Sequence, residues 1–240
     1  MMEAGLSFFV GIIGNVISVL VFLSPIGTFR RIVKHKSTED FQSLPYVCTL
    51  LNSSLWTYYG MSKPGGLLVA TVNGFGIFVE AVYVALFLVY APRNTRVKTG
   101  ILVGILDVGF VAAAIAVTQL ALEGETRIGA IGLMGSGLNI IMYGSPLAAM
   151  KTVVRTKRVE YMPFSLSFFL FLNGGIWAFY AFLVHDFFLG VPNGIGFLLG
   201  TAQLLLYAIY KNAKPSNHSA TLEGLMEQGW QKEPLVSPLQ

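Results

Sequence analysis

Polar and aromatic side chains that could hold an uncharged ligand recur in pairs along the chain. An amide offers two hydrogen-bond donors and an acceptor, and an indole offers a flat apolar face. Trp56 and Trp177 each follow an asparagine by four residues, one turn later on the same face of a helix. This combination suits a polyhydroxylated, uncharged ligand. The paired polar positions are Ser18 with Asn139, Asn52 with Asn173, and Asn73 with Asn193.

The same residues also have purely structural interpretations. An amide in lipid has to find hydrogen-bond partners, so these asparagines are expected to face the interior of a helix bundle. There they could simply join neighbouring helices. Tryptophan, in turn, gathers at the two surfaces of a membrane. The sequence leaves both interpretations open beside that of a ligand site.

Four prolines interrupt or flank apolar runs. Each lacks a backbone N–H and can kink a helix. A static kink is one interpretation. Because the prolines occur in both halves of the sequence and toward the same side of the predicted bundle, we favour hinges that move one end of it. The four residues are Pro25, Pro45, Pro146 and Pro163.

Groups that carry out covalent or ionic chemistry are scarce in this sequence. It has no phosphate-binding loop, dinucleotide fingerprint, histidine-rich metal pattern or nucleophile motif. We therefore expect no enzyme activity, no cofactor and no metal site. Glu80 and Asp107 are the acidic residues within apolar runs, where each could relay protons or make a structural hydrogen bond. We favour the hydrogen bond. Cys48 is the single cysteine, so no disulfide can form within the chain.

The elements that position these side chains are predicted to be helices that cross a membrane. Of 240 residues, 54% are hydrophobic and 12% are charged, whereas soluble domains carry about 25% charged residues. The mean hydropathy is +0.66. A crossing helix needs about 20 mostly apolar residues. This pattern predicts an all-α membrane protein with seven transmembrane helices near residues 5–28, 44–62, 66–91, 99–121, 129–150, 163–184 and 187–210.

The distribution of charge predicts the orientation of the chain. All 16 Lys and Arg residues except Lys63 and Arg127 follow the first, third, fifth or seventh predicted helix. Basic loops stay in the cytosol, so the C-terminus is expected there and the N-terminus in a lumen or outside the cell. The first apolar run lacks a basic N-terminal region and is expected to be retained rather than cleaved as a signal peptide. Topology accounts for the net charge of +4, and no nucleic-acid partner is expected.

The chain contains an internal duplication with a shift of about 121 residues. This shift pairs Trp56 with Trp177 and Tyr59 with Tyr180, matches that chance apolar similarity would not give. A basic loop follows the first helix of both copies, so the copies are parallel, and one extra helix is needed to restore the orientation of the second. The predicted organisation is 3+1+3, a transporter design. It has a first three-helix repeat at 5–91, a linker helix at 99–121, a second repeat at 129–210 and a flexible cytosolic tail at 211–240.

Several strings of the sequence resemble the SWEET family of sugar transporters, and plant members in particular. They are GNVISVLVFLSPIGTF, KSTEDFQSLPYVCTLLNSSLWTYYG, TVNGFG, NIIMYGSPL, MPFSLSFFLFLNG and VPNG. The resemblance implies a bidirectional sugar uniporter that works by alternating access, with the four prolines as gating hinges. It also implies a central substrate-binding pocket. The pocket residues are Asn73, Asn193, Trp56 and Trp177, and the wall residues are Ser18, Val21, Asn52, Asn139, Met142 and Asn173.

The run LNIIMYGSPLAAMKTVV, with FFLFLNGGIW and VPNGIGF, is most similar to the vacuolar-membrane subgroup, which carries fructose and glucose. The resemblance therefore implies hexose transport across the vacuolar membrane, with the plasma membrane as the alternative location. The partners implied are a small-molecule sugar and the lipid bilayer, and a homo-oligomer stays open. The alternatives are a seven-helix receptor or scaffold without transport activity, against which the duplication argues, and a membrane enzyme, against which the absent catalytic motifs argue.

Overall fold

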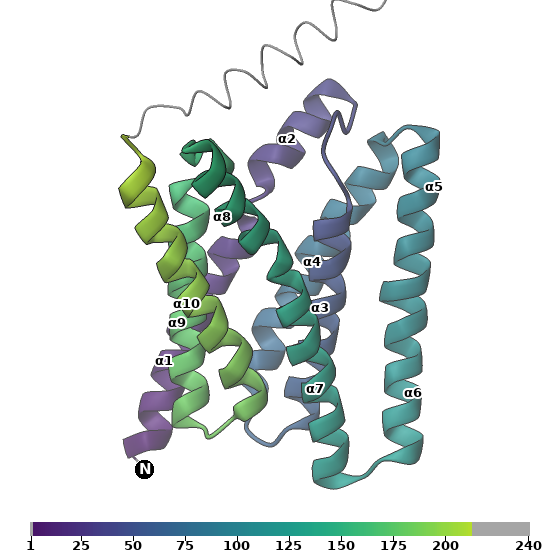
Figure 1. The fold of residues 1–240 in the computed structure, drawn as a ribbon. Coiled ribbons are helices and arrows are strands. Elements are labelled where there is room, and N and C mark those ends of the chain that lie inside the picture. The colour runs from purple at the N-terminus through teal and green to yellow at the C-terminus, as the bar shows by residue number, and fades with distance from the viewer. Residues whose placement is uncertain (1, 213–240) are drawn as a thin grey trace, which may run out of the picture.

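The computed structural model describes residues 2–212, with side chains from residue 5 onward, and this part of the chain is helical without strands (Figure 1). Residues 213–240 of the predicted tail lie outside the described residues. The elements are α1 (Met2–Leu23), α2 (Ile26–His35), α3 (Leu44–Ser62), α4 (Leu67–Tyr90), α5 (Arg93–Leu102), the π-helix η1 (Val103–Phe110), α6 (Val111–Ala121), α7 (Gly124–Met142), α8 (Gly144–Thr156), the 3₁₀-helix η2 (Val159–Tyr161), α9 (Phe164–Leu183) and α10 (Phe187–Tyr210).

The predicted fold class, seven transmembrane helices in a 3+1+3 arrangement, is confirmed. Within the described range, six helical stretches have both the length and the apolar composition of a membrane span: Gly5–His35, Leu67–Tyr90, Arg93–Ala121, Gly124–Thr156, Phe164–Leu183 and Phe187–Tyr210. The seventh is α3, which has 19 residues. Its composition is less apolar because polar side chains such as Asn52 and Ser53 lie on the face turned into the bundle.

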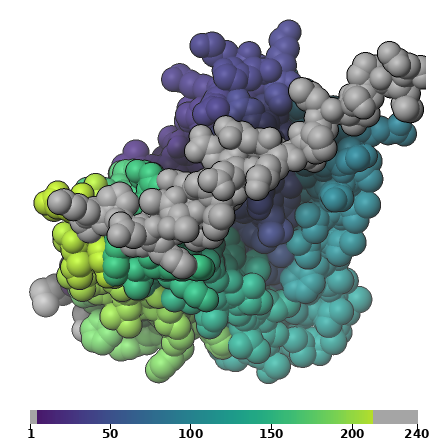
Figure 2. Space-filling model, turned by 45° about the horizontal axis from the view of Figure 1, so that its top comes forward, coloured from purple at the N-terminus to yellow at the C-terminus, as the bar shows by residue number. Residues whose placement is uncertain are grey.

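Six of the helices form a closed ring. Around the ring, α1 packs on α4, α4 on α3, α3 on α7, α7 on α10, α10 on α9, and α9 on α1. In each repeat the third helix therefore lies between the first and the second. The continuous linker of α5, η1 and α6 packs on α3 outside the ring, and it forms the teal edge of the molecule in Figure 2. The two repeats meet along α1–α9 and α3–α7, two equivalent seams.

Matching hydrogen bonds in the two repeats confirm the alignment of the duplication. Asn15 on α1 donates to the Leu68 carbonyl at 3.0 Å. At the equivalent place in the second repeat, Ser136 on α7 donates to the Phe188 carbonyl at 2.6 Å. Pro192, inside α10, cannot supply the N–H that would normally bond that carbonyl, and the Ser136 hydroxyl takes its place.

The first and fifth predicted spans differ from the structure in their bounds, because a further helix follows the joint at Pro25 and another the joint at Pro146. The sequence predicts spans ending near residues 28 and 150, followed by basic loops. Instead α1 ends at Leu23, and α2 carries the chain on to His35, while α7 and α8 continue to Thr156. Proline fits the first turn of a helix, where its missing N–H is not needed. Pro25 has no N–H to donate to the Val21 carbonyl four residues earlier. That carbonyl accepts instead from the Ser24 backbone N–H at 3.1 Å and from the Ser24 hydroxyl at 2.7 Å.

The linker is longer than predicted and is locally widened. It begins at Arg93 rather than near residue 99, and its middle, Val103–Phe110, is a π-helix. Asp107 lies in this π-helix, and neither oxygen of its buried carboxyl group has a hydrogen-bond partner in the described part of the chain. The structural hydrogen bond expected for Asp107 is therefore wrong. Glu80 on α4 is 3% exposed, and its Oε2 is likewise without a partner among the described residues.

Candidate functional site

A central cavity of about 290 Å³ lies between the two repeats. Every residue that the sequence predicted to bind substrate lines this cavity. Further lining residues, which sequence reasoning missed, come mostly from apolar positions that carry no signal of their own. They are Phe22, Thr49, Ser53, Val69, Val72, Tyr143, Leu170 and Leu189.

The polar walls of the cavity are joined across both seams between the repeats. On the α1–α9 seam, the Ser18 hydroxyl donates to Asn173 Oδ1 at 2.6 Å. On the equivalent α3–α7 seam, Asn52 Nδ2 donates to Asn139 Oδ1. These two bonds are related by the internal repeat, because Ser18 is paired with Asn139 and Asn52 with Asn173. The side chains therefore join neighbouring helices and line the cavity at once, so the two interpretations drawn from the sequence coexist.

Asn73 and Asn193 occupy matching places on α4 and α10. Each donates one amide N–H to the backbone carbonyl four residues earlier. Asn73 donates to Val69 at 2.9 Å, and Asn193 donates to Leu189 at 2.8 Å. These bonds fix the orientation of the side chains, while each amide keeps a second N–H and its oxygen. Asn52 adds a buried Oδ1 that has no hydrogen-bond partner in the described range. The cavity thus offers fixed neutral donors and acceptors.

Trp56 and Trp177 are inside the molecule rather than in an interfacial belt. Their exposed fractions are 4% and 5%, so the belt interpretation is wrong. The Trp177 indole N–H donates to the Ser18 hydroxyl at 2.8 Å. Each indole packs edge-on against a tyrosine one turn later, with ring centroids 5.3 Å apart in both repeats. The two planes are held by equivalent surroundings on opposite sides of the cavity.

Each indole also reaches a glycine of the other repeat. A Cβ built on Gly14 of α1 would stand 3.1 Å from Trp177, and one built on Gly135 of α7 would stand 3.1 Å from Trp56. That distance is tighter than ordinary van der Waals contact. Glycine at these two positions therefore lets the indoles lie flush against the neighbouring helix backbone.

One end of the cavity is closed by a charged contact between the repeats. The Tyr59 hydroxyl donates to the Asp186 carboxylate at 3.0 Å, and Lys63 Nζ pairs with the same carboxylate at 2.6 Å. Asp186 is 6% exposed, and it also caps α10 by accepting the Leu189 N–H at 3.0 Å. Sequence reasoning missed this contact because Asp186 lies in a short connection outside the aligned motifs.

The four prolines lie at the opposite end, with α2 and α8 (Figure 1). Pro25 and Pro146 stand at the joints of α1 with α2 and of α7 with α8, whereas Pro45 and Pro163 stand at the first turns of α3 and α9. The latter two thus begin helices rather than kink them. In the described part of the chain, no hydrogen bond joins the two repeats at this end, in contrast to the end closed by Asp186.

Comparison with known proteins decides the family. A family model described as "Sugar efflux transporter for intercellular exchange" matches the chain twice, over residues 8–95 and 129–215. The two matches correspond to the two repeats and leave out the linker. This chain belongs to the SWEET family of sugar transporters.

Similar SWEET proteins cover nearly the whole chain. The bidirectional sugar transporter SWEET17 of Arabidopsis thaliana is 61% identical over 96% of this chain and 98% of its own length. SWEET16 of the same plant is 58% identical over 88% of this chain and 93% of its own. A solved eukaryotic SWEET transporter has a TM-score of 0.84 and 40% identity, covering 88% of this chain and 99% of that one.

Membership in the SWEET family makes this a multi-pass membrane protein of a sugar-transporting family rather than an enzyme. The receptor and enzyme alternatives are set aside by the double family match and the shared fold. Among the described residues, no three His, Cys, Asp or Glu side chains gather as metal ligands would.

Proposed function

We propose that this SWEET protein carries hexoses, fructose and glucose, in either direction through the central cavity. The observation that supports this best is the composition of the cavity wall. Fixed amides on five helices surround two indole planes, which matches a ligand with hydroxyls around its rim and C–H groups on its faces. The amides of Asn52 and Asn173, bonded along the two seams between the repeats, take up part of the cavity wall, which favours one sugar ring over two.

Transport is proposed to be uniport, driven by the sugar gradient alone. Within the described range, no Asp, Glu, Lys, Arg or His side chain lines the cavity. A proton-coupled carrier needs a titratable group whose charge changes along with substrate binding. Glu80 and Asp107 lie outside the lining, so neither is in a position to couple proton movement to a bound sugar directly.

Alternating access is proposed to use the two unlike ends of the cavity. The Tyr59–Asp186–Lys63 contact holds one end shut, while the other ends of the helices meet at prolines. Hinge motion at Pro25 and Pro146 would swing α2 and α8 together and close that end as the charged contact opens. The gating role of all four prolines is part of this proposal.

The vacuolar membrane is the proposed location, with the plasma membrane as the alternative. The strings LNIIMYGSPLAAMKTVV, FFLFLNGGIW and VPNGIGF, which resemble the vacuolar-membrane subgroup, support this location. The basic residues of α2, α5 and α8 gather at the proline end. The positive-inside rule favours a cytosolic proline end and C-terminus, and a lumenal or extracellular N-terminus. Self-association into a homo-oligomer is compatible with this arrangement.

Radiolabelled fructose flux into proteoliposomes tests the proposal. Asn73→Ala and Asn193→Ala each remove hydrogen bonds to the sugar, of roughly 0.5–1.5 kcal/mol apiece, and we expect each to abolish most of the flux. Asn94→Ala, on the exposed surface of α5, is the matched control and should transport normally. Size-exclusion profiles establish that all three variants are folded. Normal flux in both pocket variants would refute the assignment of the cavity.

A pH gradient imposed across the same vesicles tests uniport separately. The expected result is that the fructose concentration inside the vesicles rises to the concentration outside and does not exceed it. Accumulation above equilibrium would overturn uniport while leaving the sugar site intact, and Glu80→Gln would be the first variant to examine.

A further inference from the structure

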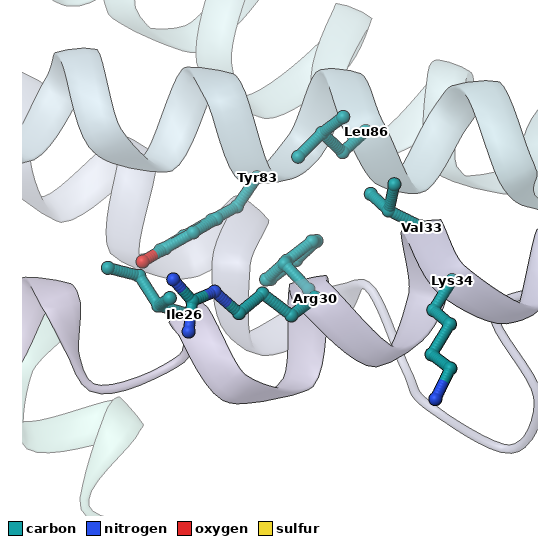
Figure 3. Close-up of a pocket in the computed structure, with 7 residues that line it drawn as sticks. Ile26, Arg30, Val33, Lys34, Tyr83 and Leu86 are labelled. Carbon is teal, nitrogen blue, oxygen red and sulfur yellow. The ribbon is translucent and has the colours of Figure 1, made fainter.

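A second cavity lies away from the sugar pathway, on the outer surface between α2 and α4. It has a volume of about 370 Å³. Its floor and walls are apolar, formed by Ile26, Phe29 and Val33 of α2 with Tyr83 and Leu86 of α4. Arg30 and Lys34 of α2 complete the lining. Figure 3 shows Arg30 extended alongside the groove toward the hydroxyl end of Tyr83, with Lys34 one turn further along α2.

This groove sits where the hydrocarbon of a membrane ends. The 22 residues of α1 extend about 33 Å at 1.5 Å per residue, enough to cross the hydrocarbon core of about 30 Å. Since α2 follows directly, it lies at the polar boundary. Ile26 and Val33 nevertheless remain 39% and 40% exposed. An apolar groove at this depth is open to acyl chains, while the basic side chains beside it are at the level of lipid headgroups.

The basic residues of α2 divide into two groups. Arg31 and His35 turn toward Glu39, at 2.6 Å and 2.7 Å. Arg30 and Lys34 are exposed, and neither pairs with a carboxylate in the described part of the chain. Two cations without acidic partners therefore border the groove, one turn apart and on the same helix.

We propose that this groove is a binding site for an anionic membrane phospholipid. The phosphate and the acidic headgroup bind Arg30 and Lys34, and one acyl chain lies along Ile26, Val33 and Leu86. Charge complementarity selects an anionic lipid over a zwitterionic one, and basic pockets at helix boundaries on the cytosolic side suit this class of ligand. The apolar floor distinguishes the site from one for a free phosphate, which would gain nothing from it.

Native mass spectrometry of the full chain, purified in detergent with added phosphatidylserine or phosphatidylcholine, tests this site independently of sugar transport. The double variant Arg30→Gln, Lys34→Gln should bind phosphatidylserine roughly 30-fold more weakly, at about tenfold per 1.4 kcal/mol and about 1 kcal/mol for each charge. Arg93→Gln with Lys98→Gln removes the same charge from exposed positions on α5 and should bind like the unmodified protein. Equal losses in the two double variants would overturn the proposal, because they would show general attraction to a basic surface.

A second variant tests the acyl-chain half of the site. Val33→Trp keeps both cations and fills the groove, so this variant should bind phosphatidylserine more weakly. In a separate competition with the unmodified protein, glycerophosphoserine, which is the headgroup without acyl chains, should not displace bound phosphatidylserine. Undiminished binding to Val33→Trp, or displacement by glycerophosphoserine, would overturn the lipid assignment. So would equal retention of phosphatidylcholine. A carbodiimide cross-link from Lys34 to Glu223 or Glu227 that excludes added lipid would show the C-terminal segment to be the occupant instead.

Discussion

We expect single amides to set the width of the proposed sugar pathway. Asn52 and Asn139 bond each other across one seam, and Asn173 bonds Ser18 across the other. Each amide extends further from its helix than a hydroxyl at the same position would. A ligand that has to displace such side chains loses roughly 1–3 kcal/mol to overpacking. The cavity is therefore expected to admit fructose and glucose and to carry sucrose poorly.

Shrinking these amides should change the sugar preference. In the triple variant Asn52→Ser, Asn139→Ser, Asn173→Ser, the ratio of sucrose flux to fructose flux should rise about tenfold, because the cavity widens while keeping hydroxyl partners. Competition flux in proteoliposomes measures this ratio. Asn15→Ser is the matched control, since the second repeat already has Ser136 at that place in the same hydrogen bond. A triple variant that keeps its hexose preference would show that these side chains do not set the size limit.

A carboxylate outside the membrane gives a prediction for pH. The hydrogen bond from Arg31 lowers the pKa of Glu39 below its ordinary value, and His35 contributes in the same direction. Because the pKa is lower in the folded state, the pairing stabilises the protein at neutral pH, and this stabilisation is lost as the pH falls through the folded-state pKa. The group is exposed, so the effect is small. The melting temperature of Glu39→Gln should lie below that of the unmodified protein at neutral pH, with the difference shrinking from about pH 5 toward about pH 2. A difference that grows on acidification would contradict the pairing.

At the residue level the sequence predicted the polar lining well and the closing contact poorly. The lining asparagines stand out because amides are costly in lipid and because both copies of the repeat carry polar residues at these places. Asp186 and Lys63 are ordinary loop charges in the sequence, and only the folded chain brings them within 2.6 Å of each other. Their contact also has no counterpart in the other repeat, so the duplication gave no hint of it.

At the level of elements, the joint at Pro25 is held in part by side-chain hydrogen bonds. The Val21 carbonyl before Pro25 accepts from the Ser24 hydroxyl as well as from the Ser24 backbone N–H, and the Phe22 carbonyl accepts from the Tyr83 hydroxyl at 3.1 Å. Side-chain bonds of this kind can exchange as a helix bends, whereas a continuous backbone ladder resists bending. The hinge proposed for α1 and α2 therefore rests on local geometry as well as on the proline itself.

Replacing the joint prolines should stiffen the helices and slow transport. Alanine at Pro25 or Pro146 restores the missing N–H and favours a continuous helix, since proline inside a helix costs about 3 kcal/mol. We expect fructose flux to fall about tenfold or more in Pro25→Ala and Pro146→Ala, because a barrier higher by about 1.4 kcal/mol already slows a step tenfold, while the melting temperature holds or rises. Pro92→Ala, in the extended connection before α5, should leave flux unchanged. Full flux in both joint variants would mean that the prolines are static kinks.

The sequence could not predict that α2 and α8 are helices. Their basic residues mark them as the ends of spans, and a proline near each start suggests a break. Yet the residue that caps the end of α2, Lys36, has the left-handed conformation, with φ of 52°, and so does Lys157 after α8, with φ of 60°. These matched ends show that the short helices are a repeated feature rather than frayed loops. The widened turn of η1 has no sequence signal that we can identify.

For the whole molecule, the duplication predicts two equivalent three-helix units, but it does not determine the order in which their six helices pack around the ring. Parallel copies and an inverting linker could be predicted from charge and periodicity. The placement of α4 between α1 and α3, and of α10 between α7 and α9, could not, because every one of these helices has an apolar face that would fit several neighbours. Two of the ring contacts, α1 with α9 and α7 with α3, include the close approach of Gly14 to Trp177 and of Gly135 to Trp56, which no local pattern reveals.

Those two glycine contacts predict a crossed pattern of second-site suppression. The added methyl group of Gly14→Ala would clash with Trp177, and that of Gly135→Ala would clash with Trp56. The compensating substitution for each variant therefore lies in the other repeat. Trp177→Phe should restore the melting temperature lost in Gly14→Ala, and Trp56→Phe should not, while Gly135→Ala should show the reverse. Thermal unfolding of the four double variants measures this, and a suppressor that works equally on both glycines would contradict it. Neither repeat can therefore gain a side chain at this glycine unless the tryptophan of the other repeat becomes smaller.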